Sequence, residues 1–527
     1  MKFLRFVRVF SVFVFAVLAT MPVAQGQLHF AEAVPYSSGG IYANSVAVAD
    51  LNGDGKLDLV VGNGCQTPNQ TGGCPGQLGE VSVLLGNGDG TSQPAISYSS
   101  GGYQAFSLAV GDVNGDGHPD VVVTNQCQTL ACNNGGVSVL LGNGDGTFQA
   151  ALTYSSGGDQ PTSIAIGDLR GDGKVDLVVT NFGVAFGNIF SVGVLLGNGD
   201  GTFQPVVIYD SGGYNPISVA IADVNGDGHP DVVAANWCGN GNCGEDGTMS
   251  VLLGNGDGKF EPAVAYDSGG RLPESVAVAD LRGNGILDLV VANVVSVGGD
   301  SGSDVVGVLL GNGDGSFQPA VSYSAGGNGN DALAVGDVNG DGIPDLVVVE
   351  ECRSPISGRG RCFGGGRLAL LLGNGDGTFQ QAIGHGSGGF GGTSVAIRDV
   401  NGDGRPDLLV TNSEATKGDG NHSAVAAVLN KTSYSTQTTL TSSSNPSRVG
   451  QSITFTATIA STPPVPNGEL ITFYNGETNL GTGTTTNGVA SLSTSFFKAK
   501  TYTIKASYPR DAFHKKSSGT VKQVVNP

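Results

Sequence analysis

Charged residues are scarce in this chain, and basic residues are the scarcer kind. Asp, Glu, Lys and Arg make up only 13% of the 527 residues, and 25 Lys and Arg stand against 45 Asp and Glu. The net charge of −20 argues against a nucleic-acid partner, because phosphate binding needs a basic face. The 88 glycines and the few charged residues disfavour long helices and favour short strands with many turns.

Signatures of catalysis are also missing. The sequence contains no H-E-x-x-H and no G-x-S-x-G motif, and its six histidines are scattered. A repeated G-N-G-D-G segment is similar to a phosphate-binding loop, but it lacks the G-x-G-x-x-G spacing and leads into another strand. These absences lead us to predict a protein that is not an enzyme.

The N-terminus has the three parts of a signal peptide. Lys2, Arg5 and Arg8 form a basic start, residues 9–18 form an apolar stretch, and residues 24–26 form a small-x-small cleavage site. No later segment approaches the length of a transmembrane helix. We therefore predict a signal peptide at 1–26, no membrane span after its removal, and a secreted or cell-surface location.

Eight cysteines fall in four close pairs. An even number of cysteines in an exported protein predicts disulfides, and pairing within each close pair is the simplest arrangement. A metal site is the weaker reading, because no pair has the C-x-x-C spacing. The predicted disulfides are Cys65–Cys74, Cys127–Cys132, Cys238–Cys243 and Cys352–Cys362.

One acidic segment, D-x-N-G-D-G-x-x-D or a close variant, recurs along most of the chain. Its steps are 55 to 62 residues long, and a second segment close to V-S-V-L-L-G-N-G-D-G-T-F follows each of the first six copies. Such a period indicates a repeat architecture. The copies begin at Asp50, Asp112, Asp168, Asp223, Asp280, Asp337 and Asp399.

Each repeat contains four strand signals, which is the content of one propeller blade. The ends of the array are informative. Residues 30–36 match a fourth strand that has no preceding three, and the seventh copy stops after its third strand near Asn430. The first segment can therefore complete the last blade and leave no open edge. We predict a seven-bladed β-propeller over 27–430, closed by an N-terminal strand.

The composition changes after Lys431. Glycine becomes less frequent, Thr and Ser become more frequent, and strand signals appear at 452–460, 470–474, 489–494, 502–508 and 521–525. Alternating apolar and polar residues, as in 453–459, are typical of strands with one buried face. We predict an all-β immunoglobulin-like sandwich over 431–527.

The acidic loop has the composition of a calcium site. Calcium takes about six to eight oxygen ligands, and positions 1, 3, 5 and 9 of the loop supply side-chain oxygens while position 7 supplies its carbonyl. An EF-hand would need a Glu at position 12, and a dockerin would continue into a helix; position 12 of the first loop is Val61, inside a strand signal. A plain turn explains one copy but poorly explains repeated groups of three carboxylates.

We predict about five calcium ions, with loop three as a doubtful sixth site. Arg170 replaces the third-position ligand in loop three, and Arg282 and Asn284 replace two ligands in loop five. We expect Arg282 to fold over loop five and pair with both Asp280 and Asp288 in place of the cation. The predicted ligands are Asp50, Asn52, Asp54, Lys56 and Asp58; Asp112, Asn114, Asp116, His118 and Asp120; Asp168, Asp172, Lys174 and Asp176; Asp223, Asn225, Asp227, His229 and Asp231; Asp337, Asn339, Asp341, Ile343 and Asp345; and Asp399, Asn401, Asp403, Arg405 and Asp407.

The repeats resemble the FG-GAP/VCBS family, whose blades are of the same type as those of the integrin alpha-subunit propeller. The resemblance covers about residues 30–430 and rests on the repeated D-x-N-G-D-G-x-x-D loop at blade spacing. It implies a propeller with calcium in its hairpin loops and a role in adhesion or carbohydrate binding. The C-terminal segment is similar to bacterial immunoglobulin-like repeats, on the strand pattern and the Y-N-G-E-T-N-L-G hairpin at 474–481.

These observations favour a secreted calcium-binding scaffold that recognises an extracellular glycan or protein. We expect the loops with the cysteine pairs to lie together on the face opposite the acidic loops; these loops also contain Trp237, Arg353, Arg359 and Arg361. They either bind a ligand or are solvated loops that disulfides protect from proteases. Two alternatives remain, a polysaccharide-active enzyme built on the propeller and a structural cell-envelope spacer.

Overall fold

The computed structural model describes residues 28–66, 77–130, 132, 134–183, 190–239, 247–294, 304–352, 365–415 and 422–527. These residues form strands and turns and no helix, which confirms the all-β prediction. Consequently, no apolar helix of membrane-spanning length occurs among them. They divide into two compact parts, residues 28–432 and residues 433–527.

Each acidic loop belongs to a unit of four antiparallel strands. The first two units share the long strand β5 and form one seven-stranded sheet, and each of the next four units forms a sheet of its own. The first sheet contains β2 (Ile41–Ala49), β3 (Asp58–Cys65), β4 (Leu78–Leu84), β5 (Ile96–Gly111), β6 (Asp120–Cys127), β7 (Gly136–Leu140) and β8 (Leu152–Ser155). The next four contain β9 (Pro161–Gly167), β10 (Asp176–Asn181), β11 (Ser191–Leu195) and β12 (Val207–Asp210); β13 (Tyr214–Ala222), β14 (Asp231–Cys238), β15 (Thr248–Leu252) and β16 (Val264–Asp267); β17 (Pro273–Ala279), β18 (Asp288–Asn293), β19 (Val305–Leu309) and β20 (Val321–Ser324); and β21 (Asn328–Gly336), β22 (Asp345–Cys352), β23 (Arg367–Leu371) and β24 (Ile383–Gly386).

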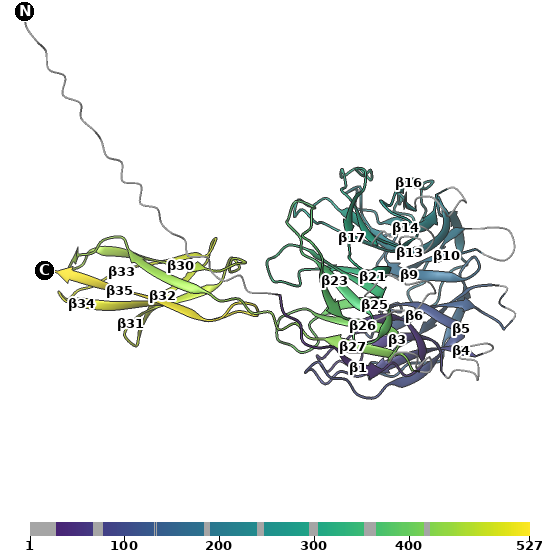
Figure 1. Ribbon diagram of the computed structural model, residues 1–527, viewed down its shortest axis with the longest axis horizontal. Helices are drawn as coiled ribbons and strands as arrows, with labels where there is room; N and C mark the ends of the chain where they lie inside the picture. The colour runs from purple at the N-terminus through teal and green to yellow at the C-terminus, as the bar shows by residue number, and fades with distance from the viewer. Residues whose placement is uncertain are drawn as a thin grey trace, which may run out of the picture. The chain divides into compact units, whose positions relative to one another are not determined.

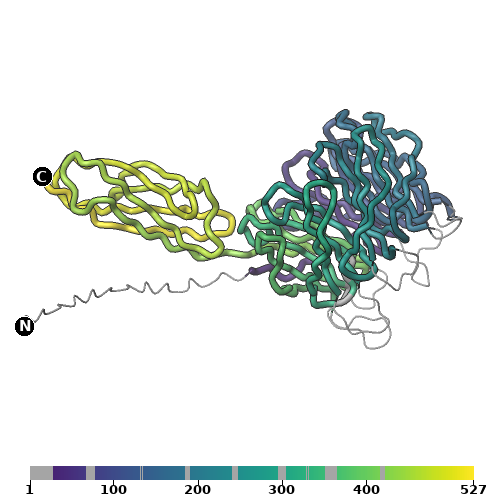
Figure 2. Tube along the Cα trace, turned by 90° about the horizontal axis from the view of Figure 1, so that it is seen from above, coloured from purple at the N-terminus to yellow at the C-terminus, as the bar shows by residue number. Residues whose placement is uncertain are grey.

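The seventh unit combines the two ends of this part of the chain. Strands β25 (Phe390–Arg398), β26 (Asp407–Glu414) and β27 (Ala424–Val428) come from its end, and β1 (Val34–Ser37) comes from its start. β1 pairs antiparallel with β27, with Val34 opposite Ala427, and both ribbon and tube show the purple start of the chain beside green strands (Figures 1 and 2). The N-terminal strand therefore completes the last sheet, as predicted.

Neighbouring units are joined along their first strands. A serine on each of five first strands accepts a hydrogen bond from the backbone of the next unit, over 3.2 to 3.4 Å. The pairs are Ser45 with Leu108, Ser163 with Val219, Ser218 with Val276, Ser275 with Leu333, and Ser394 with Val46. The last pair joins the seventh unit to the first, and these two units also share one buried cluster that includes Val46 and Val425.

Aromatic pairs join the units at their outer strands. The Tyr of one fourth strand packs edge-on against the Phe of the next unit's G-N-G-D-G-T-F turn, with ring centroids 5.5 to 5.6 Å apart. These pairs are Tyr98–Phe148, Tyr154–Phe203, Tyr209–Phe260, Tyr266–Phe317 and Tyr323–Phe379. In the seventh unit Phe30 takes the Phe position, because it bridges to Asn430 and packs against His385. The N-terminal segment therefore supplies both a strand and a ring to the last unit.

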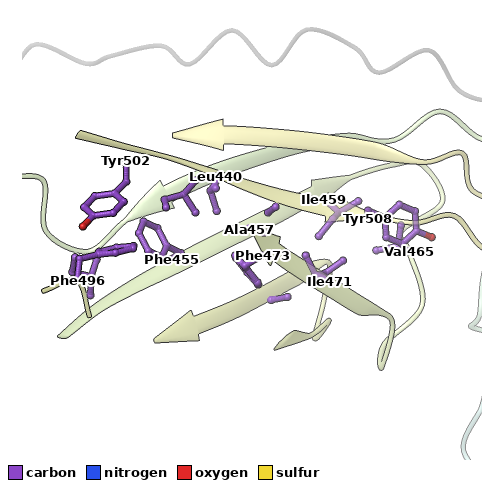
Figure 3. Close-up of a cluster of buried hydrophobic side chains, with 14 of the residues drawn as sticks. Leu440, Phe455, Ala457, Ile459, Val465, Ile471, Phe473, Phe496, Tyr502 and Tyr508 are labelled. Atoms are coloured by element: carbon purple, nitrogen blue, oxygen red, sulfur yellow. The ribbon is translucent and has the colours of Figure 1, made fainter. Parts of the chain in front are cut away.

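The C-terminal part is a sandwich of two sheets. Its core holds Phe455, Phe473 and Tyr508, each 0% exposed, together with Ile471 (Figure 3). The strand predictions at 452–460 and 489–494 are confirmed, and the 474–481 segment is the predicted hairpin between β31 and β32. One sheet contains β28 (Gln437–Ser442), β30 (Ser452–Ala460) and β33 (Val489–Ser495); the other contains β29 (Ser447–Arg448), β31 (Leu470–Asn475), β32 (Thr478–Thr484), β34 (Thr501–Tyr508) and β35 (Ser517–Asn526).

One of the predicted disulfides lies within the described residues. Cys127 is bonded to Cys132, which confirms that pair. Cys65 and Cys238 are also disulfide-bonded. Their predicted partners and Cys362 lie outside the described residues, so the other three pairings remain predictions.

Candidate metal loops

The acidic loops connect the first and second strands of every unit. In the first loop, which runs from Asp50 to Asp58 between β2 and β3, Gly53 and Gly55 have φ values of 71° and 80°. Glycine adopts such positive values without a steric penalty, so the chain can turn tightly there. The loop lies next to the following unit's G-N-G-D-G turn, because Gly146 donates a hydrogen bond to the carbonyl of Leu51.

The first aspartate of each loop organises the turn. The Asp50 carboxylate accepts hydrogen bonds from the backbone N–H groups of Gly53, Asp54 and Gly55 at 2.8, 3.2 and 2.9 Å. Asp112 and Asp223 make the same three contacts in their loops. This carboxylate therefore gathers several N–H groups around one negative charge.

The ninth-position aspartate is buried and holds the loop in place with two backbone hydrogen bonds, which we call the clasp. Asp58 is 0% exposed, and its two carboxylate oxygens accept hydrogen bonds from Leu51 at 3.0 Å and from Gly86 at 2.7 Å. The second bond ties the acidic loop to the end of the third strand. Asp120, Asp176, Asp231, Asp288, Asp345 and Asp407 make the corresponding pair of bonds. From the sequence we expected only a metal-binding role for this residue, and these two backbone hydrogen bonds were not predicted.

Burial makes the negative charge on several of these ninth-position aspartates unfavourable. Desolvation raises the pKa of Asp58, and the neighbouring carboxylates Asp54 and Asp50 raise it further. The same causes raise the pKa of Asp120 and Asp231, and they bring the pKa of Asp345 to about 7 and that of Asp407 to about 6. Like charges held this close repel, and a bound cation relieves that repulsion.

Loops three and five contain their own cation. In loop three, the Arg170 guanidinium contacts both oxygens of Asp176, through Nη2 at 2.8 Å and Nε at 3.3 Å. It also donates to the Gly197 carbonyl at 2.8 Å and lies 3.2 Å from Asp172. Arg282 repeats this arrangement on Asp288 and the Gly311 carbonyl, at 2.6, 3.2 and 2.9 Å.

This geometry corrects part of the expectation for Arg282. The side chain does fold over loop five, but its guanidinium pairs with Asp288 alone among the two carboxylates. Asp280 instead accepts backbone N–H groups, from Arg282 at 3.2 Å, Asn284 at 3.1 Å and Gly285 at 2.7 Å. Among the described residues, no salt bridge reaches the ninth aspartate of the other five loops.

The other five loops contain suitable donor atoms but no assembled metal shell. Their first, third, fifth and ninth positions carry carboxylate or amide oxygens, the hard ligands that calcium prefers. Within the described part of the chain, however, no three Asp, Glu, His or Cys side chains are grouped so that they could hold a metal ion. In the first loop, the Asp50, Asn52 and Asp54 oxygens accept backbone hydrogen bonds instead. An ion would have to draw these side chains together.

The loops of the opposite face are only partly described. Trp237 is half-buried and packs edge-on against Phe182, with ring centroids 4.8 Å apart. Arg353, Arg359 and Arg361 lie outside the described residues, as does the whole segment between Cys352 and Cys362.

Comparison with protein families assigns both parts of the chain. An FG-GAP-like repeat matches residues 73–123, 128–179, 184–234, 239–291, 292–348 and 360–410, and an FG-GAP repeat matches residues 42–84. The chain therefore belongs to the FG-GAP repeat family, as its acidic loops predict. A bacterial Ig-like domain of group 3 matches residues 440–526. No curated protein matches the chain. The combination fits an extracellular or adhesion-type scaffold.

Proposed function

We propose that the protein is a secreted recognition scaffold, in which a calcium-stabilised seven-bladed β-propeller is followed by an immunoglobulin-like domain. Its ligand is an extracellular glycan or protein, and the scaffold does not transform it. The observation that carries this proposal is the repeated acidic loop, which in two of seven copies contains an arginine at the place where the other five have asparagine.

The closed seven-bladed ring is supported by three sets of contacts. β1 completes the seventh unit, Ser394 accepts the Val46 N–H across the first and last units, and Phe30 occupies the ring position of the seventh unit. Each of these contacts joins residues from opposite ends of the repeat array. An open array would leave an unpaired edge at each end, which favours aggregation.

Calcium is the cation that fits five of the loops. Loops one, two, four, six and seven keep an asparagine at position 3 and carboxylates at positions 1, 5 and 9. These residues and the carbonyl of position 7 would hold the ion, which would neutralise the crowded carboxylates and stiffen the hairpin. Loops three and five are excluded from this set, because a guanidinium already contacts their ninth aspartate.

The experiment that tests this function measures binding and turnover together. The full chain is applied in calcium buffer to an array of glycans and extracellular matrix proteins, and soluble polysaccharides are assayed in parallel for released reducing ends. Saturable binding without product release supports the recognition scaffold. Catalytic release of sugar from any polysaccharide would contradict it, and so would the absence of any ligand on the whole array.

A further inference from the structure

The third unit breaks a packing rule that several other units keep. Seven residues before the glycine that opens each G-N-G-D-G turn, at the start of the third strand or just before it, four units have a glycine, namely Gly79, Gly135, Gly247 and Gly366. A Cβ atom at Gly135 would overlap Cδ of Pro161, and one at Gly247 would overlap Cδ of Pro273. The third unit has Phe190 at this position. Two further units have Asp304 and Ser423 at this position, so Phe190 is the one aromatic residue there among the seven units, and its surroundings can serve a local purpose.

A cavity of about 640 Å³ lies beside Phe190. It is located where β12 of the third unit ends and β13 of the fourth unit begins, and Gly239 after β14 lines it as well. This volume lies within the range of clefts that bind small molecules. We call it the Phe190–Tyr214 pocket.

One wall of this pocket is a continuous aromatic surface. The rings of Phe190 and Tyr214 are 4.9 Å apart between centroids, and their planes are tilted by 55°. Tyr214 is 38% exposed, so the surface is open to solvent. Asp210, also exposed, uses one carboxylate oxygen to accept the Gly212 N–H at 2.9 Å, while its second oxygen makes no hydrogen bond to any described residue.

We propose that the Phe190–Tyr214 pocket binds a neutral saccharide. A pyranose ring has a face of C–H groups that packs on aromatic rings, and it has hydroxyl groups that donate hydrogen bonds to a carboxylate. The Asp210 charge and the net charge of −20 disfavour an acidic sugar. This inference rests on the proposed recognition function and names the ligand class and the site.

A cationic side chain is the main competing ligand, and the ring geometry disfavours it. An aromatic cage surrounds a cation with separate rings, each about 6 Å or less from the charge. Phe190 and Tyr214 contact each other and form one wall rather than enclosing a gap. The contacting rings leave no gap for a cation between them, whereas a sugar ring can pack its C–H face on the exposed ring of Tyr214.

The test uses affinity electrophoresis and calorimetry of the full chain in calcium buffer. The probes are soluble neutral glucan, mannan, galactan and xylan, with polygalacturonate and a lysine-rich peptide as the charged probes. The variants are Tyr214→Ala and Phe190→Gly, the second of which restores the glycine of the other units. Tyr103→Ala is the matched control, because Tyr103 holds the position of Tyr214 in the second unit. The preceding unit has Gly79 in the place of Phe190, so Tyr103 has no aromatic partner from that position.

Wild type is expected to bind at least one neutral polysaccharide, and both pocket variants should weaken that binding at least tenfold. The Tyr103→Ala variant should bind like wild type, and the melting temperatures of all three variants should report intact folding. Unchanged binding by the folded pocket variants would overturn the pocket but leave the recognition function standing. Binding only to the acidic polymer or to the peptide, or to no neutral probe, would also overturn it.

Discussion

Loops one, two, four, six and seven share asparagine at position 3, whereas loops three and five share arginine there, and loop five also has Asn284 in place of the fifth-position aspartate. The first group has asparagine at position 3, and its buried ninth aspartate meets only backbone N–H groups and, in two loops, the amide of that asparagine. The second group has arginine there, and its guanidinium contacts both oxygens of the ninth aspartate. The backbone clasp is the same in both groups. Loops three and five therefore place a positive charge on the buried ninth aspartate, which no described salt bridge does in the other five loops.

The largest difference between the groups should appear when calcium is removed. Five independent sites at tenfold their dissociation constant together stabilise the fold by about 7 kcal/mol. An excess of chelator should therefore lower the melting temperature of the full chain by roughly 10 °C, measured by circular dichroism. The isolated immunoglobulin-like domain has none of these loops, so chelator should leave its melting unchanged if that domain folds alone. An unchanged full-chain melting temperature would rule out structural calcium.

Removal of the built-in cation should be the next largest effect. Arg282→Ala leaves the Asp288 carboxylate with its two backbone hydrogen bonds only. The Asp288 side chain is 0% exposed and that of Arg282 is 17% exposed, so water does not replace the lost guanidinium. Breaking this pair should destabilise the protein by about 2–3 kcal/mol in chelator. Urea denaturation measures the change.

The control for this variant is Lys259→Ala. Lys259 contacts Asp257 at 2.6 Å, but both side chains are more than half exposed, so water screens the pair. Loss of Lys259 should leave the urea midpoint unchanged. Equal effects of the two substitutions would mean that the Arg282 contact contributes no more than an ordinary surface ion pair.

Conversion of loop five into the calcium type should add one ion. Arg282→Asn together with Asn284→Asp restores the asparagine and the missing carboxylate of the first group. The double variant should bind one more calcium than wild type, counted by calorimetry, and should gain about 1.4 kcal/mol at tenfold the dissociation constant. No additional ion in a folded double variant would contradict the equivalence of arginine and calcium.

The reverse conversion should remove one ion with a smaller change in stability. Asn225→Arg places a guanidinium in loop four next to the Asp231 clasp, in the pattern of loops three and five. We expect the calcium count to fall by one and the melting temperature in chelator to rise slightly, because the new side chain neutralises the loop without metal. A full count in this variant would show that arginine does not exclude the ion.

The sequence predicts what repeats at fixed spacing and misses hydrogen bonds between residues that lie far apart within one repeat. The D-x-N-G-D-G-x-x-D copies predicted the four-stranded units, and the unmatched segment at 30–36 predicted that β1 pairs with β27. The clasp of Asp58 on Gly86 could not be read from the sequence, because that bond joins residues 28 positions apart and no local motif marks it. A comparison of the copies at the fourth strand and the turn offered a signal for the Tyr–Phe pairs, since both residues recur.

The candidate metal loops show the same limit. Composition predicts the oxygen atoms, but it does not decide between an ion and backbone N–H groups as their partners. Arg282 could be predicted to fold over its loop, since the loop lacked two ligands. The Arg282 guanidinium pairs with Asp288 and not with Asp280, because backbone N–H groups already surround Asp280. The folded turn places those N–H groups, so the sequence alone did not predict the pairing.

The calcium stoichiometry of the wild-type chain tests the central claim most directly. The full chain is dialysed against chelator and then against saturating calcium, and the bound metal is counted per chain by elemental analysis. We predict about five ions, one for each loop with asparagine at position 3. Seven ions would contradict the exclusion of metal by arginine, and no bound ions would contradict the calcium assignment itself.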